Sequence, residues 1–419
     1  MNQKLTLASD SKKTHYFYYF VLTLLFTILF NHSLRSVSVL RWGLMAFFIF
    51  TFLLTYKMYF TFDPRYSLWI LVFIGFACAS IIWAESASNA FSVAQTLISN
   101  VITLMIIRSG IKTKKDIELI LMSFVISCFI NGIYILSYSK ESLLALNDAI
   151  GYEYRLGMNM EGGEWNANTI GLMMSTSVVS LLYFFKKINS KLMRLLIIGL
   201  NVFFISLALL SGSRKALIMI ILGLLLYLFL TSKGKIVRNV IVVLIAIYVI
   251  MYAVQNIPFF YKTLGYRVEG LMAFITGEGT VDNSTVVRNQ IIDAAMQVFK
   301  QYPITGCGIN CFSMFNVSIT GYELYSHNNF TELLSCLGII GFSLYYSGYA
   351  YIIYSLFIKR KKDELTSLLF SAILITTILE YAFVSYYDFM IGLIVMLCFA
   401  VVSINNDNEL SVSNIDQGD

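Results

Sequence analysis

Long apolar segments recur along the whole chain, and they limit the possible fold more than any other feature of the sequence. Most approach the roughly 20 residues that an α-helix, rising about 1.5 Å per residue, needs to cross a bilayer core of about 30 Å. Backbone polar groups inside lipid must bond within the segment, so such segments are expected to be helices. About twelve membrane spans are predicted, near residues 16–31, 37–56, 67–84, 93–108, 117–138, 167–185, 195–211, 214–231, 239–256, 329–358, 364–384 and 388–404.

Composition agrees with one all-α polytopic membrane domain over residues 1–419, because 58% of the residues are hydrophobic and only 13% are charged. The first apolar segment lacks a small-residue cleavage site and is expected to remain as an anchor. The short connections on one side leave no room for a nucleotide-binding fold, and no glycine-rich phosphate loop occurs in a strand–helix setting. An enzyme with this sequence is therefore not expected to take a nucleotide-activated substrate through a cytosolic domain.

The basic residues predict the orientation in the membrane. With both termini placed in the cytoplasm, 20 of the 30 Lys and Arg residues fall in short cytoplasmic segments, including the cluster at residues 359–362. This is the distribution that the positive-inside rule describes. The net charge of +6 is therefore no sign of nucleic-acid binding. With this orientation, the longer loops on the opposite side are extracytoplasmic.

Two segments on the predicted outer side are long, at residues 139–166 and 257–328. The second lies between the ninth and tenth spans, and such loops often carry functional residues. Within it, an amphipathic helix is predicted, with Val287, Ile291, Ala294, Ala295 and Val298 on one face and Tyr302-Pro303 at its end.

Cysteines give no sign of a metal site. Cys307 and Cys311 form a C-x-x-x-C pair in the second loop, but no second ligand pair accompanies them, so no metal and no cofactor are predicted. The remaining cysteines lie in apolar segments and are expected to be packing residues. Glu380 is the only clear acidic residue within a predicted span.

The stretch Ser211 to Leu217, SGSRKAL, is the first candidate for chemistry. Arg214 and Lys215 are predicted in the first turn of a helix, where the helix dipole disfavours cations. A bound anion resolves this conflict, because a helix N-terminus together with a guanidinium makes a good phosphate site. The alternative is an interfacial arginine that reaches toward lipid headgroups.

Arg288 and His327 are the other candidates on the same predicted side. Arg288 begins the amphipathic helix, where an exposed arginine is often simply solvated. His327 lies just before the tenth span, which Asn329 is predicted to cap in a capping box with Glu332. The helix dipole is expected to keep the imidazole neutral, as a general base must be at neutral pH. Its alternative role is that of a polar residue at the membrane interface.

Taken together, SGSRKAL, the segment from Arg288 to Gly308 and HNNFTELLSCLGIIG from His327 resemble the O-antigen ligase and polymerase family in order and spacing. The earlier stretch YRLGMNMEGGEWNANTIG is similar to that family's Arg-Gly and Asn-Pro-Asn motif, with Ala167 in place of the proline. The resemblance implies a metal-independent glycosyltransferase with a C-type membrane fold. It implies that Arg214 and Arg288 hold a diphosphate and that His327 activates the acceptor. Lys215, Arg155, Asn168 and Asn328 are expected to bind substrate.

The implied donor is a glycan on undecaprenyl diphosphate, polymerised into O-antigen or capsular polysaccharide on the outer face of the plasma membrane. A chain-length regulator or flippase of the same pathway is an expected partner. The main alternative is a ligase that moves a finished chain to a lipid A core, since only the acceptor differs. A lipid-linked glycan transporter is the third reading, but transporters usually place charges at the membrane midplane.

Overall fold

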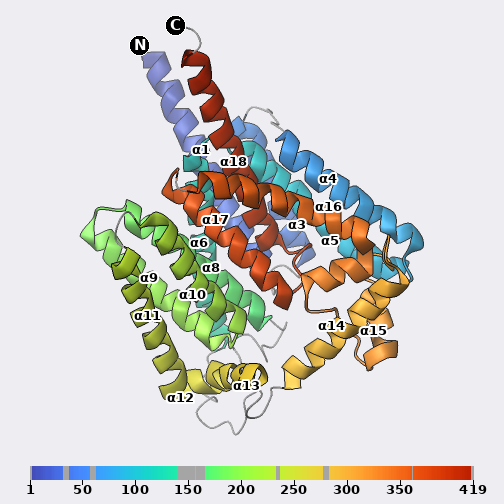
Figure 1. Cartoon of the computed structure of the whole chain (residues 1–419). Helices are drawn as coiled ribbons and strands as arrows, with labels where there is room; N and C mark the ends of the chain where they lie inside the picture. Colours follow the sequence, from blue (N-terminus) through green and yellow to red (C-terminus); the bar gives the residue numbers. More distant parts are fainter. Residues whose placement is uncertain are drawn as a thin grey trace. The chain divides into compact units, whose positions relative to one another are not determined.

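The computed structural model describes residues 2–31, 37–56, 63–139, 156, 166–232, 236–276, 283–360 and 362–416. Within these ranges every regular element is a helix and no strand occurs (Figure 1). The predicted all-α fold is therefore confirmed. The predicted outer loop 139–166 lies almost entirely outside the described ranges.

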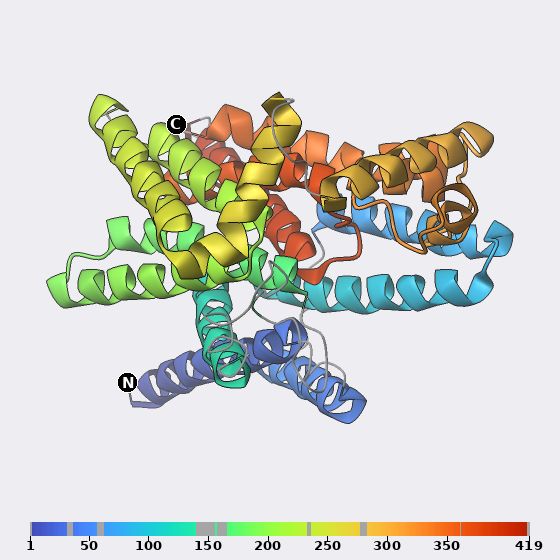
Figure 2. The same ribbon diagram turned by 90° about the horizontal axis from the view of Figure 1, so that it is seen from below.

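The chain folds as two compact units, and each is described by itself. Unit 1 comprises Met1–Phe60 and Thr113–Met272. In it α1 packs against α3 and α6, and α8 packs against α6, α9 and α10 (Figure 2). Its helices are α1 (Asn2–Phe30), α3 (Ser38–Tyr56), α6 (Lys114–Tyr138), α8 (Ala167–Lys187), α9 (Lys191–Leu210), α10 (Arg214–Thr231), α11 (Ile236–Asn256), α12 (Pro258–Phe260), the π-helical turn Tyr261–Gly265, and α13 (Tyr266–Thr276), which crosses the unit boundary.

Unit 2 comprises Thr61–Lys112 and Ala273–Asp419. Here α4 packs against α5 and α16, α14 against α15 and α16, and α18 against α5 and α17. Its helices are α4 (Pro64–Ala79), α5 (Ala87–Gly110), α14 (Asn283–Gln301), α15 (Phe312–Thr320), α16 (Asn329–Lys359), α17 (Glu364–Leu379) and α18 (Phe389–Asp416), with 3₁₀ turns at Ser80–Trp83 and Glu380–Ala382.

Helices of membrane-spanning length occur at the predicted places. Among the described residues, 10 helices are long and apolar enough to cross a membrane, and two shorter apolar helices cover His15–Phe30 and Val39–Thr55. Together they coincide with the twelve predicted segments. Burial differs among these helices. In the 18-residue apolar stretch of each helix, 78% of the residues are buried in α8 and in α18, but only 17% are buried in α11. Exposed apolar faces of this kind suit contact with lipid, so the chain is a multi-pass membrane protein.

The predicted single span over residues 329–358 is wrong in one respect, because α16 folds back on itself at Gly338. This residue has φ 61° and ψ −168°, outside the helical region. Asn329 Nδ2 donates to the Tyr346 hydroxyl at 3.0 Å, although the two residues are 17 positions apart. A straight helix would separate them by about 25 Å. Residues 329–337 and 339–359 therefore form two antiparallel helical arms, which we call the α16 hairpin.

The loop at residues 303–308, PITGCG, provides the hydrogen bonds that the broken helix lacks. Cys307 N and Gly308 N donate to the carbonyls of Ser335 and Cys336, each at 2.9 Å. In the other direction, the backbone N–H groups of residues 339 and 340 donate to the carbonyls of residues 303 and 304. The loop thus satisfies the carbonyls that end one arm and the N–H groups that begin the next.

Close backbone approach at this crossing requires glycine. A Cβ on Gly338 would lie 2.3 Å from the Ile304 carbonyl oxygen, and one on Gly306 would lie 2.2 Å from the Cys336 carbonyl carbon. With its non-helical φ and ψ, Gly338 breaks the helix between the two arms of the hairpin.

Candidate active site

His327 and Asn328, two of the functional residues predicted in unit 2, lie at the start of the α16 hairpin. His327 is half-buried and has φ 57°, a left-handed conformation that is uncommon for a residue with a side chain. Its ring lies against the Tyr325 ring, with 4.2 Å between centroids. Unusual backbone conformations of this kind persist only when the surrounding structure holds them, and they concentrate at functional sites.

Asn328, rather than Asn329, is the N-cap of α16. Its side-chain oxygen accepts from Phe330 N at 2.9 Å and from Thr331 N at 3.2 Å. The predicted capping box between Asn329 and Glu332 is therefore wrong. Glu332 is buried, and its Oε2 accepts from Ser326 N at 2.7 Å, so it holds the residue that precedes His327.

Arg288 lies near this segment, as the pKa of Tyr325 indicates. Burial raises the pKa of Tyr325 above its usual range, while the Arg288 guanidinium acts to lower it and the Glu332 carboxyl acts to raise it. Arg288 is half-buried, and within the described ranges it makes no hydrogen bond or ion pair. The structure thus brings both Arg288 and His327 near the same tyrosine, and it leaves the guanidinium able to receive an anion.

The helix that carries Arg288 is the predicted amphipathic one. Ile291, Ala294, Ala295 and Val298 are fully buried, α14 packs against α16, and the helix ends at Gln301, just before Tyr302. Both the apolar face and the end of this helix are confirmed. The buried face fixes α14 on the hairpin, and this packing determines where Arg288 lies.

Arg214 belongs to unit 1 and starts α10 as predicted. Helix α9 ends at Leu210, Gly212 takes φ 61°, and Ser213 is the N-cap of α10. Arg214 is half-buried, and its Nη1 donates to the Arg267 carbonyl at 3.3 Å. The guanidinium therefore lies between the start of α10 and the first turn of α13. Lys215 follows it and is also half-buried.

Ser213 leaves the start of α10 without a side-chain cap. Its Oγ makes no capping bond, and it is a buried polar atom with no partner among the described residues. Buried hydroxyls are rarely left unpaired in folded proteins. An unpaired hydroxyl beside the first N–H groups of a helix and a guanidinium suits an anionic ligand.

The first turns of α8 lie against this same segment. A Cβ on Gly171 would come within 2.5 Å of Ser211 Oγ and 2.7 Å of Ser213 Cβ. Leu156 N donates to the Leu210 carbonyl at 3.0 Å. Leu156 and Gly171, near the two ends of the predicted motif, therefore lie close to residues 210–213 in unit 1. Asn168 is half-buried in α8, whereas Arg155 lies outside the described residues.

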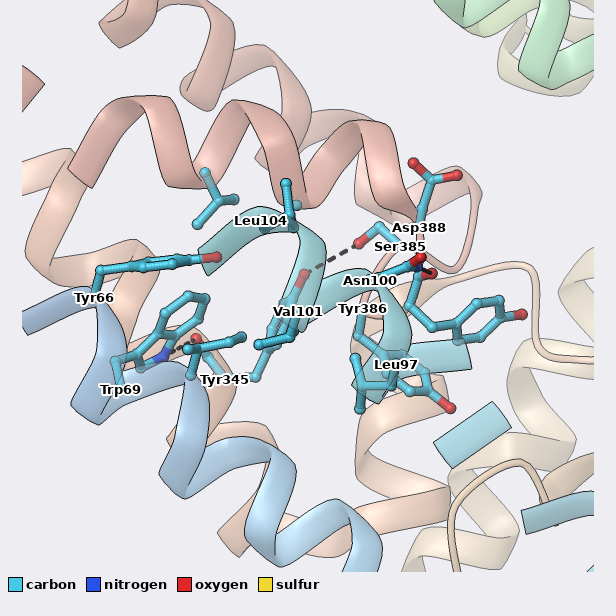
Figure 3. Close-up of a pocket in the computed structure, with 14 residues that line it drawn as sticks. Tyr66, Trp69, Leu97, Asn100, Val101, Leu104, Tyr345, Ser385, Tyr386 and Asp388 are labelled. Carbon is cyan, nitrogen blue, oxygen red and sulfur yellow. Dashed lines mark hydrogen bonds between the residues drawn. The ribbon is translucent and has the colours of Figure 1, made fainter. Parts of the chain in front are cut away.

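Sequence reasoning noted Glu380 as an acid within a span but missed its surroundings. Glu380 is fully buried and accepts hydrogen bonds from the hydroxyl groups of three α16 tyrosines and Ser385. Beside it is a small pocket of unit 2 lined by aromatic and aliphatic side chains, with Asn100, Ser385 and Asp388 among its polar residues (Figure 3). Tyr345 and Ser385 lie on its wall.

The cysteines of the 303–311 segment are buried. The thiols of Cys307 and Cys311 are free, and burial raises the pKa of Cys311 above its usual value. In the part of the chain that the structure describes, no group of three or more His, Cys, Asp or Glu side chains is placed to hold a metal ion.

Comparison with known families agrees with the motifs. The family model described as O-antigen ligase matches residues 199–346, a segment that contains Arg214, Arg288 and His327. The resemblance to the O-antigen ligase and polymerase family is thereby confirmed. No curated protein gives a significant match to the chain.

Proposed function

The chain carries an O-antigen ligase domain at residues 199–346, and we propose that it is a glycosyltransferase that uses a glycan on undecaprenyl diphosphate. In this proposal it joins lipid-linked repeat units into O-antigen or capsular polysaccharide. The reaction takes place on the outer face of the plasma membrane. The observation that carries the proposal is that Arg288, which has no bond to a described residue, and His327 both lie near Tyr325.

The leaving group accounts for the arginines. The bond between the anomeric carbon and the diphosphate oxygen breaks, and the undecaprenyl diphosphate departs with the electron pair. Guanidinium groups stabilise developing phosphate charge and bind it in a bidentate manner. We assign this role to Arg214 and Arg288, with the Ser213 hydroxyl and the first N–H groups of α10 as further donors. Lys215 adds positive charge at the same helix start.

The acceptor accounts for the histidine. A sugar hydroxyl forms the new bond to the anomeric carbon, and its proton passes to the His327 imidazole and then to solvent. General-base catalysis of this kind typically contributes about 10²–10⁴-fold. Asn328 fixes the helix start beside His327, which supports a positioning role for it. Asn168 and Arg155 are proposed to bind substrate, and no metal is required because the arginines carry the charge.

Two acceptors fit this chemistry. In a polymerase the growing chain is transferred to a single lipid-linked repeat unit, and this is the preferred proposal. In a ligase the finished chain is transferred to a lipid A core, and the family description, O-antigen ligase, favours that second candidate.

The test uses purified protein and undecaprenyl-diphosphate-linked repeat units, with and without a lipid A core acceptor. A ladder of longer lipid-linked chains formed from donor alone supports the polymerase. Transfer only when the core lipid is present supports the ligase. No new glycosidic bond under either condition, with donor shown to bind, would overturn the proposed function.

The outer location has its own test. Ser318 is exposed in α15 and Lys362 is exposed between α16 and α17. In a variant with Cys78 replaced by serine, the five remaining native cysteines are buried. A cysteine introduced at position 318 is then expected to react with a membrane-impermeant thiol reagent in cells with a permeabilised outer envelope. A cysteine at position 362 is expected to react only after lysis. The opposite result would reverse the orientation.

A further inference from the structure

Glu380 lies at the centre of a network of hydroxyl groups at the end of α17. Its Oε1 accepts from Tyr349 at 2.6 Å, from Ser385 at 2.5 Å and from Tyr345 at 3.5 Å. Its Oε2 accepts from Tyr346 at 2.9 Å. The carboxyl group therefore has four hydroxyl partners on two segments of unit 2, the second arm of the hairpin and the segment 383–388 that joins α17 to α18.

This carboxyl group is unusual for its location. Glu380 is 0% exposed and lies within a helix of membrane-spanning length. Among the described residues it forms no ion pair with a lysine or arginine. Ionisable residues are costly inside membrane helices and commonly serve function where they persist. Packing alone would be served equally well by an apolar side chain.

The network extends from Glu380 to the start of the hairpin through Tyr346. The Tyr346 hydroxyl, which donates to Glu380, also accepts from Asn329 Nδ2 at 3.0 Å. On its other side, Asn329 Oδ1 accepts from Ser385 N at 2.9 Å and from Tyr386 N at 3.2 Å. Stacking of Phe330 on Tyr346, with 6° between the ring planes, adds to this contact.

Asn329 is two residues after His327, and His327 has a left-handed backbone that the surroundings must impose. Before His327, Glu332 holds Ser326 N. After it, the contacts of Asn329 hold the helix start. The histidine segment is thus held at both ends. Glu332 holds it directly at Ser326, and Glu380 holds it at Asn329 through Tyr346.

We propose that Glu380 is a positioning residue that acts through Tyr346 and Asn329 to hold His327 for proton transfer. This inference rests on the proposed function, because it assigns a purpose to the geometry of the His327 segment. Glu380 does not touch the substrate in this proposal. Its effect on the reaction passes entirely through the placement of His327.

Tyr346→Phe and Tyr349→Phe are a matched pair for the test. Each removes one hydroxyl from Glu380, but only Tyr346 also reaches Asn329. Small displacements of a catalytic group can lower rates by up to about 100-fold. Tyr346→Phe is expected to lower kcat about tenfold with little change in KM for the donor. Tyr349→Phe is expected to change kcat by less than about threefold, although its hydrogen bond is the shorter one.

A double variant separates positioning from general destabilisation. With His327→Gln already present, adding Tyr346→Phe is expected to have no further effect on turnover, because the base that it positions is gone. Independent damage to the fold would instead multiply the two losses. Glu380→Gln, which keeps the shape and one acceptor oxygen, is expected to retain more activity than Glu380→Ala.

A measurement that does not depend on turnover distinguishes failure of this inference from failure of the proposed function. The rate at which diethyl pyrocarbonate modifies His327 is measured by peptide mass spectrometry in the full chain. Tyr346→Phe is expected to change that rate at least twofold, while Tyr349→Phe leaves it within error. Equal rates in the two variants, or equal losses of kcat, would overturn the positioning role. Absence of glycosyl transfer by the wild type would instead overturn the proposed function.

Discussion

Two helix starts carry the predicted arginine and histidine, and they reach similar backbone geometry by different means. Before α10, the left-handed residue is Gly212 with φ 61°, and before α16 it is His327 with φ 57°. Glycine adopts that conformation without steric cost, so the turn before Arg214 needs little support from elsewhere. A histidine does not, and its segment is held by Glu332 on one side and by Asn329 on the other.

The two helix starts also differ in side-chain capping. Asn328 satisfies two N–H groups of α16, whereas Ser213 caps nothing with its side chain. The α16 start is capped by its own side chain, whereas the α10 start has a buried Ser213 hydroxyl with no partner among the described residues. The comparison therefore supports the proposal that the α10 start binds an anion and that the α16 start places a catalytic group.

The strongest test of this division is His327→Gln. Glutamine has a similar size and still donates a hydrogen bond, but it does not accept a proton usefully at neutral pH. Turnover of lipid-linked donor is expected to fall about 10²–10⁴-fold, the usual contribution of a general base. Donor binding, followed by displacement of a labelled donor, is expected to remain. His15→Gln in α1 serves as the control histidine, and near-normal turnover of His327→Gln would rule out the base.

The next test concerns Arg214→Lys and Arg288→Lys. Each keeps the charge but loses the planar fork that bonds two phosphate oxygens together. Loss of one transition-state donor typically costs about 10²–10³-fold, so a fall of about 100-fold in kcat/KM is expected for each variant. Lys300→Ala, exposed on the same helix as Arg288, is the control. Wild-type rates for both Lys variants would show that a point charge is sufficient.

Gly338→Ala tests whether the hairpin depends on its glycine. Its φ and ψ lie in a region that only glycine adopts readily, which costs other residues about 1–3 kcal/mol. The added Cβ would also meet the Ile304 carbonyl oxygen at 2.3 Å. The melting temperature in detergent is expected to fall by several degrees. Gly75→Ala is the control, because Gly75 lies in α4 of the same unit and the added Cβ would meet no atom within 4 Å. The melting temperature of this variant is not expected to fall.

The boundary between α9 and α10 could be predicted from the sequence, whereas the break of α16 at Gly338 could not. Ser211, Gly212 and Ser213 interrupt an apolar pattern, so the boundary between α9 and α10 is visible in the sequence and was placed correctly. Gly338 lies inside an uninterrupted apolar segment and looks like a tolerated glycine within a helix. The hairpin depends on backbone bonds to residues 303–308, about 30 positions away, and no local pattern reports such pairing.

The same limit applies to the candidate site. Residue types and their order predicted Arg214, Arg288 and His327, and the match over residues 199–346 supports the family behind them. Hydrophobic periodicity also identified the buried face of α14. It did not indicate that Arg288 and His327 both lie near Tyr325, nor that Glu380 is bonded to Tyr346. Those contacts depend on how separate helices pack, which periodicity within one helix does not specify.

The smallest expected effect, and the one that most sharpens the comparison, comes from Ser213→Ala. If the α10 start is left open for an anion, the unpaired Ser213 hydroxyl contributes little to the folded protein without donor. The melting temperature without donor is then expected to stay the same or to rise, because burying a hydroxyl with no partner costs the folded protein free energy. Donor affinity is expected to fall about tenfold, the typical effect of one hydrogen bond to a charged group.

Ser211→Ala is the matched control, because it lies in the same turn but is fully bonded. Its Oγ donates to the Ala208 carbonyl at 2.7 Å and accepts from Ser213 N at 3.2 Å. Its loss is expected to lower the melting temperature and to affect donor affinity less than Ser213→Ala does. A reversed pattern, with Ser213→Ala destabilising the protein and leaving donor binding unchanged, would mean that Ser213 has a protein partner. The α10 start would then resemble the α16 start, and the assignment of anion binding to it would fail.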